Sequence, residues 1–294
     1  MRNLKILFSL ILFGMVIATS AFATPFYFST GDPDGKIGTA SRPYSLGEIE
    51  IETADDFILT SETAINHATF TGLVPSGASG ASIQQVIVEI YRVFPSDSDV
   101  GRTSGPPTFS TPEVPTRVNS PSDVSFGYRD SAILGDLTFS TNTLSSSFTT
   151  LNSVLNGINP SPNQTTFGEG PVTGQEVLFD ITFTTPFDLP AGHYFFVPQV
   201  LLDDGNFFWL SAPKPGPFTP DLQSWIRDAG LDPDWLRIGT DIVGPPATGG
   251  SAPTFNAAFS LSGESTSVPE PSTILLLGAG LLIIGFLISR KRRK

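Results

Sequence analysis

In two stretches of this chain, apolar residues alternate with residues that are mostly small or polar. This is the pattern of β-strands that bury one face. They cover residues 177–184 and 255–262. A third stretch, residues 83–94, is apolar on both faces and is interrupted by polar side chains such as Glu89 and Arg92. We expect this stretch to be a long central strand between two layers.

Turn-forming residues separate these stretches from further strands. Strands are predicted around residues 68–74 and 194–202, and Pro186 is expected to end the strand that begins at Val177. Turns are predicted at residues 75–77, 190–192 and 203–205. Short connections between such strands favour an all-β fold, an antiparallel two-sheet sandwich, over a fold that alternates strands and helices.

One short helix is predicted at residues 219–230. Thr219 is a suitable N-cap, Pro220 suits the first helical position, and Gly230 offers a stop. Apolar residues follow at helical spacing, namely Leu222, Trp225, Ile226 and Ala229. We expect this helix to cover an end or an edge of the sandwich.

The sandwich domain is expected to span residues 24–262, a length that two-sheet folds form as one domain. Residues 95–170 are rich in Ser, Thr, Pro and Asn, and are predicted to be a loop-rich insertion. Weaker strands are expected within it near residues 137–139 and at Phe148. A small, polar linker is expected at residues 263–267.

The N-terminus has the three parts of a secretory signal peptide. Arg2 and Lys5 supply the positive charge, and residues 6–18 form an apolar stretch too short to span a membrane comfortably. Ala21-Phe22-Ala23 matches the small-x-small pattern that signal peptidase accepts. Residues 1–23 are therefore predicted to be removed during export.

The C-terminus combines two prolines, an apolar run and a basic end. Val268-Pro269-Glu270-Pro271 prevents a helix up to about Ser272, and residues 273–289 can form a single membrane-spanning helix of about 25 Å. By the positive-inside bias, the basic end stays in the cytoplasm and the main domain lies outside. The basic residues are Arg290, Lys291, Arg292, Arg293 and Lys294.

The order and spacing of these features resemble the PEP-CTERM sorting signal of Gram-negative bacteria, over residues 268–294. The resemblance implies transient anchoring in the inner membrane and processing by the membrane protease exosortase near Pro269-Glu270-Pro271. It also implies delivery to the cell surface or to an extracellular, exopolysaccharide-rich matrix. The alternative is a permanent single-span anchor.

Two short segments are similar to the first and late strands of jelly-roll-like domains in exported bacterial proteins with this kind of tail. They are Ala54-Asp55-Asp56-Phe57-Ile58-Leu59 and Phe187-Asp188-Leu189-Pro190-Ala191-Gly192-His193-Tyr194. The resemblance implies a jelly-roll-like sandwich and says nothing about activity.

The exported part of the chain is strongly acidic and has no cysteine. All 28 Asp and Glu lie within residues 24–271, together with nine of the 16 Lys and Arg, which gives an excess of 19 negative charges there. Such a surface disfavours nucleic acid and suits divalent cations. Without cysteine, disulfides, thiolate nucleophiles and zinc–thiolate sites are excluded.

No cofactor is required by any motif, and calcium is the one candidate. Ca²⁺ binds six to eight oxygens, and Asp-rich turns supply them, although none here is a complete twelve-residue calcium loop. The candidate ligands are Asp32 and Asp34, then Asp203 and Asp204, with Asp97-Ser98-Asp99 as a third cluster. Turns of this kind also form without a metal.

Three tryptophans are candidates for stacking on a sugar. Trp209 and Trp225 are predicted to be core residues, which leaves Trp235, in Asp232-Pro233-Asp234-Trp235-Leu236, as the freest candidate ligand-binding residue. The only histidines are His67 and His193, and no hydrolase or phosphate-binding motif occurs. No catalytic residue is therefore predicted.

These observations favour a non-catalytic exported protein of the cell surface or the exopolysaccharide matrix. The expected partners are signal peptidase, an exosortase-like protease, the inner membrane and exopolysaccharide. The alternatives are a carbohydrate-binding module, which needs an exposed aromatic groove, and a secreted hydrolase, which needs a cleft with two coupled carboxylates or a catalytic histidine.

Overall fold

The computed structural model describes residues 23–45, 47–75, 83–102, 114, 117–158, 165–216 and 220–266. Residues 25–265 form one compact unit, and the fold described below is the fold of this unit. Residues 1–22 of the predicted signal peptide and the predicted membrane helix at residues 273–289 lie outside the described residues. No helix within the described ranges is long and apolar enough to cross a membrane.

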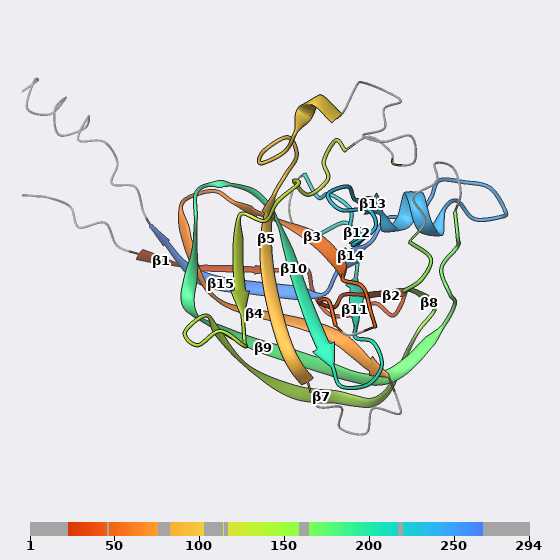
Figure 1. The fold of residues 1–294 in the computed structure, drawn as a ribbon, viewed down its shortest axis with the longest axis horizontal. Coiled ribbons are helices and arrows are strands. Elements are labelled where there is room, and N and C mark those ends of the chain that lie inside the picture. The colour runs from red at the N-terminus through yellow and green to blue at the C-terminus, as the bar shows by residue number, and fades with distance from the viewer. Residues whose placement is uncertain are drawn as a thin grey trace, which may run out of the picture. The chain divides into compact units, whose positions relative to one another are not determined.

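The unit is built from two sheets, as the alternating patterns predicted (Figure 1). The nine-stranded sheet runs β1-β15-β4-β11-β2-β8, with β14 beside β11 and with β9 and β7 continuing outward from β4. Its strands are β1 (Ala23–Ser29), β2 (Ile37–Ala40), β4 (Thr63–Pro75), β7 (Leu137–Thr150), β8 (Asn152–Val154), β9 (Val172–Leu189), β11 (Phe208–Ala212), β14 (Asn256–Ala257) and β15 (Phe259–Thr266).

The six-stranded sheet has the order β13-β12-β3-β10-β5-β6. Its strands are β3 (Ile51–Leu59), β5 (Ile83–Arg92), β6 (Gly127–Asp130), β10 (Gly192–Leu202), β12 (Trp225–Asp228) and β13 (Leu236–Arg237). β2 pairs with β8 in parallel, whereas the pairs that join β3, β4, β5, β6, β7, β9, β10, β11, β12, β13, β14 and β15 to one another, and β2 to β11, are antiparallel. The prediction of a mostly antiparallel, two-sheet, all-β fold is confirmed.

The main core lies between the two sheets and is rich in phenylalanine. Phe70 on β4 stacks against Phe179 on β9, with ring centres 4.7 Å apart and planes 7° from parallel. Phe207 meets both rings edge-on. Val177, Phe179, Ile181 and Phe183 are all buried, so the alternation in this segment identified the core face correctly.

Pro186 does not end β9, contrary to the expectation. Ile65 of β4 pairs with Phe187, and His67 pairs with Thr182, so β9 advances five positions while β4 advances two. Pro186 lies within this bulge, where the missing N–H of proline costs no ladder hydrogen bond. The strand therefore continues to Leu189.

The helix predicted at residues 219–230 is wrong. Trp225–Asp228 is strand β12, which pairs with β3 so that Trp225 lies opposite Ala54 and Arg227 opposite Glu52. The apolar residues of this short strand are buried on both faces, and their spacing coincides with that of a helical stripe. Helical turns occur elsewhere in the described chain, as a 3-10 turn at Val100–Arg102 and a π-helix at Ile238–Val243.

Two other boundaries also differ from the prediction. The weaker strands expected within residues 95–170 are one long strand, β7, which pairs with β9 as part of the nine-stranded sheet. The linker expected at residues 263–267 is largely the end of β15, which pairs with β4 as far as Ser265. Its small polar residues resemble a linker, but small polar residues also suit the solvent-facing side of a strand.

Candidate functional site

The six-stranded sheet buries a layer of polar and aromatic side chains on the face turned away from the main core. Along β5, Val88 and Ile90 belong to the main core, so Glu89 and Tyr91 point to the opposite face. Ala54 of β3, Trp225 of β12 and Trp235 pack with Tyr91 in a separate apolar cluster. This face is therefore buried, and its polar groups need partners.

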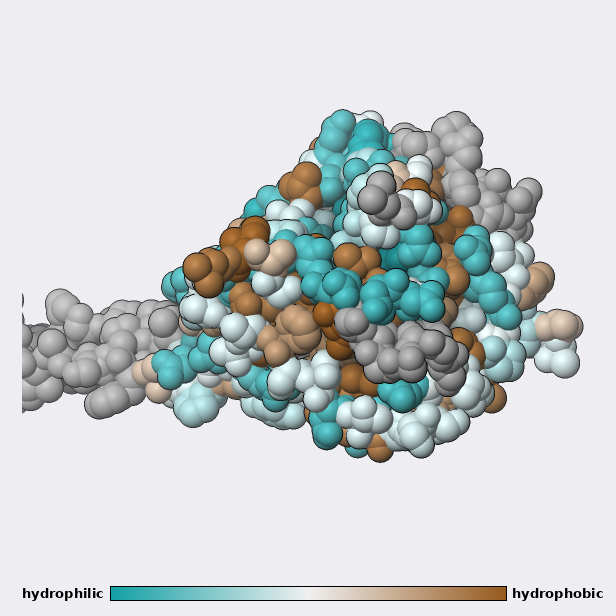
Figure 2. All heavy atoms as spheres, turned by 60° about the horizontal axis from the view of Figure 1, so that its bottom comes forward, coloured by the Kyte–Doolittle hydropathy of each residue, from teal (hydrophilic) through white to brown (hydrophobic). Residues whose placement is uncertain are grey.

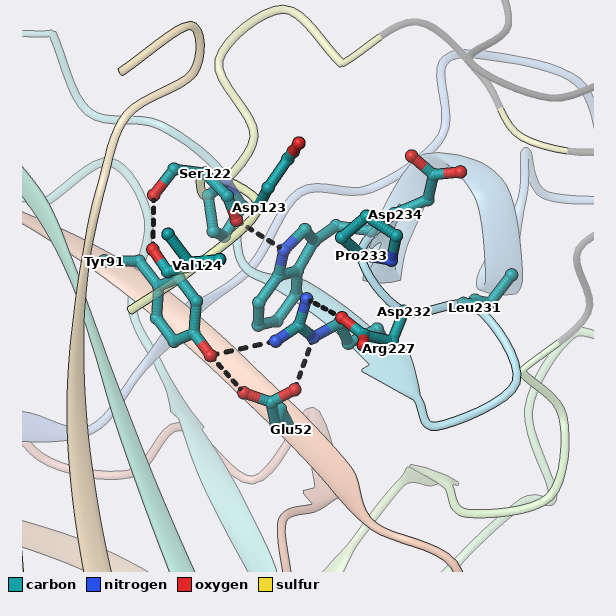
Figure 3. A network of polar contacts seen from close by, with 12 residues as sticks. Glu52, Tyr91, Ser122, Asp123, Val124, Arg227, Leu231, Asp232, Pro233 and Asp234 are labelled. Atoms are coloured by element: carbon teal, nitrogen blue, oxygen red, sulfur yellow. Dashed lines mark hydrogen bonds and ion pairs between the residues drawn. The ribbon is translucent and has the colours of Figure 1, made fainter. Parts of the chain in front are cut away.

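Arg227 is the centre of these contacts (Figure 3). Its Nε donates to the carboxylate of Glu52, the residue opposite it on β3, and its Nη1 donates to Asp232 Oδ1 at 2.8 Å. Its guanidinium carbon lies 4.3 Å from the Trp235 ring centre and 5.3 Å from the Tyr91 ring centre. Burial lowers the pKa of Arg227, but Glu52, Tyr91 and Asp232 together more than reverse this, so that the pKa lies above its ordinary value.

The Tyr91 hydroxyl has three polar neighbours. Arg227 Nη2 donates to it at 2.8 Å, while Glu52 Oε1 and Glu89 Oε2 lie 2.8 and 2.9 Å away. A tyrosine hydroxyl has a single proton to donate, so one of the two carboxyl groups must supply a proton of its own. Because Glu52 also accepts from Arg227, Glu89 is the group that holds this proton.

The surroundings of Glu89 agree with this proton count. Burial, and then the negative charge of Glu52, raise the pKa of Glu89 to about 8. Burial, followed by the charge of Glu52, also raises the pKa of Glu50. Because a raised pKa favours the neutral form, the total negative charge of Glu50, Glu52 and Glu89 is smaller than three carboxylates would carry.

A cavity of about 160 Å³ lies against this cluster, and we call it the Tyr91 cavity. Its volume is below the roughly 300 Å³ at which small-molecule pockets begin. A buried carboxyl group with a raised pKa is a feature of acid–base sites, but structural ion-pair networks produce it as well. Its lining residues are Glu50, Glu52, Glu89, Tyr91, Arg227, Ala229 and Asp232.

A second buried ion pair lies between the segments that follow β5 and β12. Arg117 is fully buried, and its Nε lies 3.1 Å from Asp234 Oδ1 while its Nη2 pairs with Asp123. Its guanidinium also lies over the ring of Phe94, 5.1 Å from the ring centre. Burial, reinforced by the positive charge of Arg102, lowers the pKa of Arg117 to about 10. Removing one partner of such a buried pair would leave the other charge buried and uncompensated.

His193 lies at the start of β10 beside β3. Its Nε2 is 2.5 Å from Oδ2 of the buried Asp56, which also accepts a hydrogen bond from the backbone N–H of Leu222 at 3.2 Å. Burial raises the pKa of Asp56, and the hydrogen bond from His193 acts against this rise. His193 also lines a cavity of about 300 Å³ with Arg92, Ser96, Pro190 and Tyr194 among its neighbours.

Trp235, predicted to be the freest tryptophan, is in fact only 1% exposed. Its indole N–H donates to the backbone carbonyl of Ser122 at 3.2 Å, and its ring packs on Arg227 and Tyr91. The expectation of an exposed stacking face is wrong: the ring is buried against Arg227 and Tyr91, and the N–H finds a partner inside the protein, as is usual for a buried tryptophan. Trp209 and Trp225 are buried, as predicted.

The candidate calcium ligands lie in two loops. Asp34, between β1 and β2, accepts from Ser211 Oγ at 2.5 Å and pairs with Lys36 at 2.9 Å, while Asp203 and Asp204 form the exposed turn after β10. Asp32 lies in the same loop as Asp34, and burial, followed by the negative charge of Asp32, raises the pKa of Glu176. No three acidic or histidine side chains of the described residues converge as a metal-binding group. Calcium binding stays a prediction.

The processing residues Val268, Pro269, Glu270 and Pro271 and the basic end at residues 290–294 lie outside the described residues. The cluster around Arg227 was not predicted from the sequence. Glu89, a charged residue in the mostly apolar run of residues 86–91, was its one visible signal, whereas the pairing of Arg227 with Glu52 depends on strand order.

Comparison with known proteins identifies the tail. Residues 267–293 match the PEP-CTERM protein-sorting motif, the C-terminal sorting signal of exosortase substrates. No curated protein and no solved structure matched the chain. The resemblance of the domain to jelly rolls therefore stays a prediction.

Proposed function

We propose, from the sorting motif at residues 267–293, that this chain is a non-catalytic protein of the cell surface or the exopolysaccharide matrix. Residues 1–23 are removed by signal peptidase during export. Residues 273–289 then anchor the chain transiently in the inner membrane, with the basic residues 290–294 in the cytoplasm. An exosortase-like protease cuts near Pro269-Glu270-Pro271 and releases the domain.

The polar clusters of the domain support a structural role. Around Arg227, each charged group faces a partner of opposite charge or a proton-sharing neighbour, and the adjoining Tyr91 cavity of about 160 Å³ is too small for a sugar unit and its neighbours. We therefore expect no hydrolysis of glycans or peptides by the purified protein.

The charge of the domain limits how it associates with a matrix. An excess of 19 negative charges over residues 24–271 repels an acidic polysaccharide unless divalent cations bridge the two. We propose weak, calcium-assisted association, with the loop of Asp32 and Asp34 or the turn of Asp203 and Asp204 as the bridging carboxylates. The burial of Trp235 argues against the alternative of a carbohydrate-binding module that stacks sugars on this ring.

The sorting role is tested by replacing Pro269-Glu270-Pro271 with three alanines in the full chain, expressed in a bacterium that processes such tails. The variant is expected to be exported but to stay uncleaved in the inner-membrane fraction, as determined by fractionation and mass spectrometry. Pro245→Ala with Pro246→Ala, two prolines of an exposed loop, is the matched control and should be released normally. Normal release of the tail variant would refute the proposal.

Matrix association is tested by titration calorimetry of the released protein with an acidic polysaccharide. Binding is expected in calcium and should be lost with a chelator, and Asp32→Asn with Asp34→Asn should weaken it. Binding that is indifferent to chelator would overturn the calcium bridge. Steady product formation during the titration would overturn the non-catalytic role.

A further inference from the structure

β7 forms a long outer edge of the nine-stranded sheet. It pairs with β9 along one side, from Leu137 opposite Phe183 to Thr150 opposite Val172. Within the ranges that the structure describes, no strand pairs with its other side. In Figure 1, β7 follows the lower margin of the domain, outside β9. Such an edge presents unpaired backbone N–H and C=O groups to a further strand.

This edge has no charge in a strongly acidic protein. Charged residues make up 15% of the chain, yet residues 137–168, between Asp136 and Glu169, contain none. Figure 2, turned so that the lower side of Figure 1 comes forward, shows pale residues of intermediate hydropathy over the lower part of this face. Edge strands are usually protected by lysine, proline or inward-pointing charge, and β7 has none of the three.

The first half of β7 is also regular. Leu137 to Thr143 pair with β9 without interruption, and the bulges that twist the strand come later, at Ser145 and before Phe148. Residues 140–144 are exposed, and Leu144 is 49% exposed to solvent. A regular, exposed and uncharged run of this length is what edge-to-edge pairing requires.

We propose that β7 is an assembly edge, at which a second copy of this chain pairs antiparallel with the first and joins their nine-stranded sheets. Two acidic molecules repel each other over most of their surfaces, and an uncharged strand is where their backbones can approach without opposing carboxylates. An antiparallel pairing of two identical strands is two-fold symmetric, so the edge is complementary to itself. The side chains of Ser140, Thr141 and Asn142 are small hydroxyl and amide groups, which can lie beside their counterparts in the second copy without a clash. The proposal does not depend on matrix association.

The absence of cysteine makes this contact directly testable in the full chain. Single cysteines are placed at Ser140, Thr141, Asn142 and Thr143, and cells that export the protein are treated with a mild oxidant. A disulfide needs Cα atoms within about 7 Å, so only positions near the two-fold axis should form a dimer of twice the chain mass. The yield should peak at one or two adjacent positions and fall on both sides. Thr60→Cys, in an exposed turn, is the control and should stay monomeric.

A charge experiment separates loss of pairing from loss of folding. Ser140→Lys with Asn142→Lys adds like charges to both copies beside the two-fold axis, and should reduce cross-linking at Thr141→Cys and Thr143→Cys several-fold although it lowers the net negative charge. Ser140→Glu with Asn142→Glu should do the same. Co-expression of the two variants should restore the dimer as a mixed pair, which misfolded variants cannot do. The control with the same charge change is Thr60→Lys with Ser251→Lys, which should cross-link normally.

The proposal is overturned if no β7 cysteine forms the dimer, or if Thr60→Cys forms it equally well. It is also overturned if the β7 cysteines cross-link to a protein of another mass, or if co-expression restores nothing. A position-dependent peak with rescue by the opposite charge supports it.

Discussion

The guanidinium of Arg227 lies 4.3 Å from the centre of the Trp235 ring, although Trp235 belongs to a turn that looks exposed in the sequence. Arg227 bonds Glu52 of β3 on one side and Asp232 of this turn on the other. One side chain thus connects the six-stranded sheet to the segment that covers it. Arg227 makes this connection through hydrogen bonds to two carboxylates and through the contact of its guanidinium with the Trp235 and Tyr91 rings.

Replacing Arg227 with methionine should destabilise the domain by about 3–5 kcal/mol, because it leaves the buried Glu52 carboxylate without its cation. Arg92→Met is the matched control. Arg92 pairs with Asp97 but is 40% exposed, and an exposed pair contributes about 0–1 kcal/mol. Urea denaturation followed by tryptophan fluorescence measures both, and similar losses would contradict a special role of Arg227.

Glu89 should make the domain less stable as the pH rises. Its pKa is raised from 4.5 to about 8, so between these values the folded state holds a proton that the unfolded chain releases. This contribution is fully present below pH 4.5 and is lost as the pH rises to about 8. Within that window, the free energy of unfolding should fall by at most about 1.4 kcal/mol per pH unit through this group.

Glu89→Gln should reduce that slope, because glutamine cannot titrate. The comparison must be made between the variant and the parent chain, since burial also raises the pKa of Asp55 and Asp56 and these carboxyl groups contribute in the same direction. Denaturation curves between pH 5 and pH 8 provide the measurement. An unchanged slope would show that Glu89 does not hold the proton.

Phe179→Ala should lower the stability of the domain by about 3–5 kcal/mol, since it removes a fully buried ring from the main core. Phe167→Ala is the control, because that ring is 62% exposed. It should change the free energy of unfolding by no more than about 0.5 kcal/mol. Thermal melts in a buffer with chelator would test, at the same time, that the fold needs no metal.

Gly72 should not tolerate even alanine. A Cβ atom there would overlap the ring of Phe207 and lie 2.8 Å from the carbonyl oxygen of Phe208. Overpacking of this kind costs about 1–3 kcal/mol. Phe207→Leu in the same chain should recover part of the loss, as contacting residues do in double-mutant cycles. Equal losses for Gly72→Ala and for Gly101→Ala, whose Cβ would meet only the flexible end of Asp99, would contradict this account.

The alternation of apolar and polar residues predicted the sheets, because a strand that buries one face has an apolar residue at every second position, as in the segment around Phe179. The pattern failed where both faces are buried, as at Trp225, since a short apolar run fits a strand and a helix equally well. It also failed at Trp235, which remained as the freest tryptophan once Trp209 and Trp225 were assigned to the core, whereas Arg117 and Arg227 pair with its neighbours Asp234 and Asp232. The polar cluster could not be predicted, because Glu52, Tyr91 and Arg227 come from strands whose order in the sheet has no local signal.

The last strand of the domain lies between two early ones, because β15 pairs with β1 on one side and β4 on the other. The backbone N–H of Thr30 also bonds the carbonyl of Phe259 at 3.1 Å. The nine-stranded sheet is therefore incomplete without residues 259–266. The strand that completes it is followed directly by the sorting motif, which begins at residue 267. A chain truncated before β15 would lack the strand that covers β4, and this edge of β4 would be open to other strands.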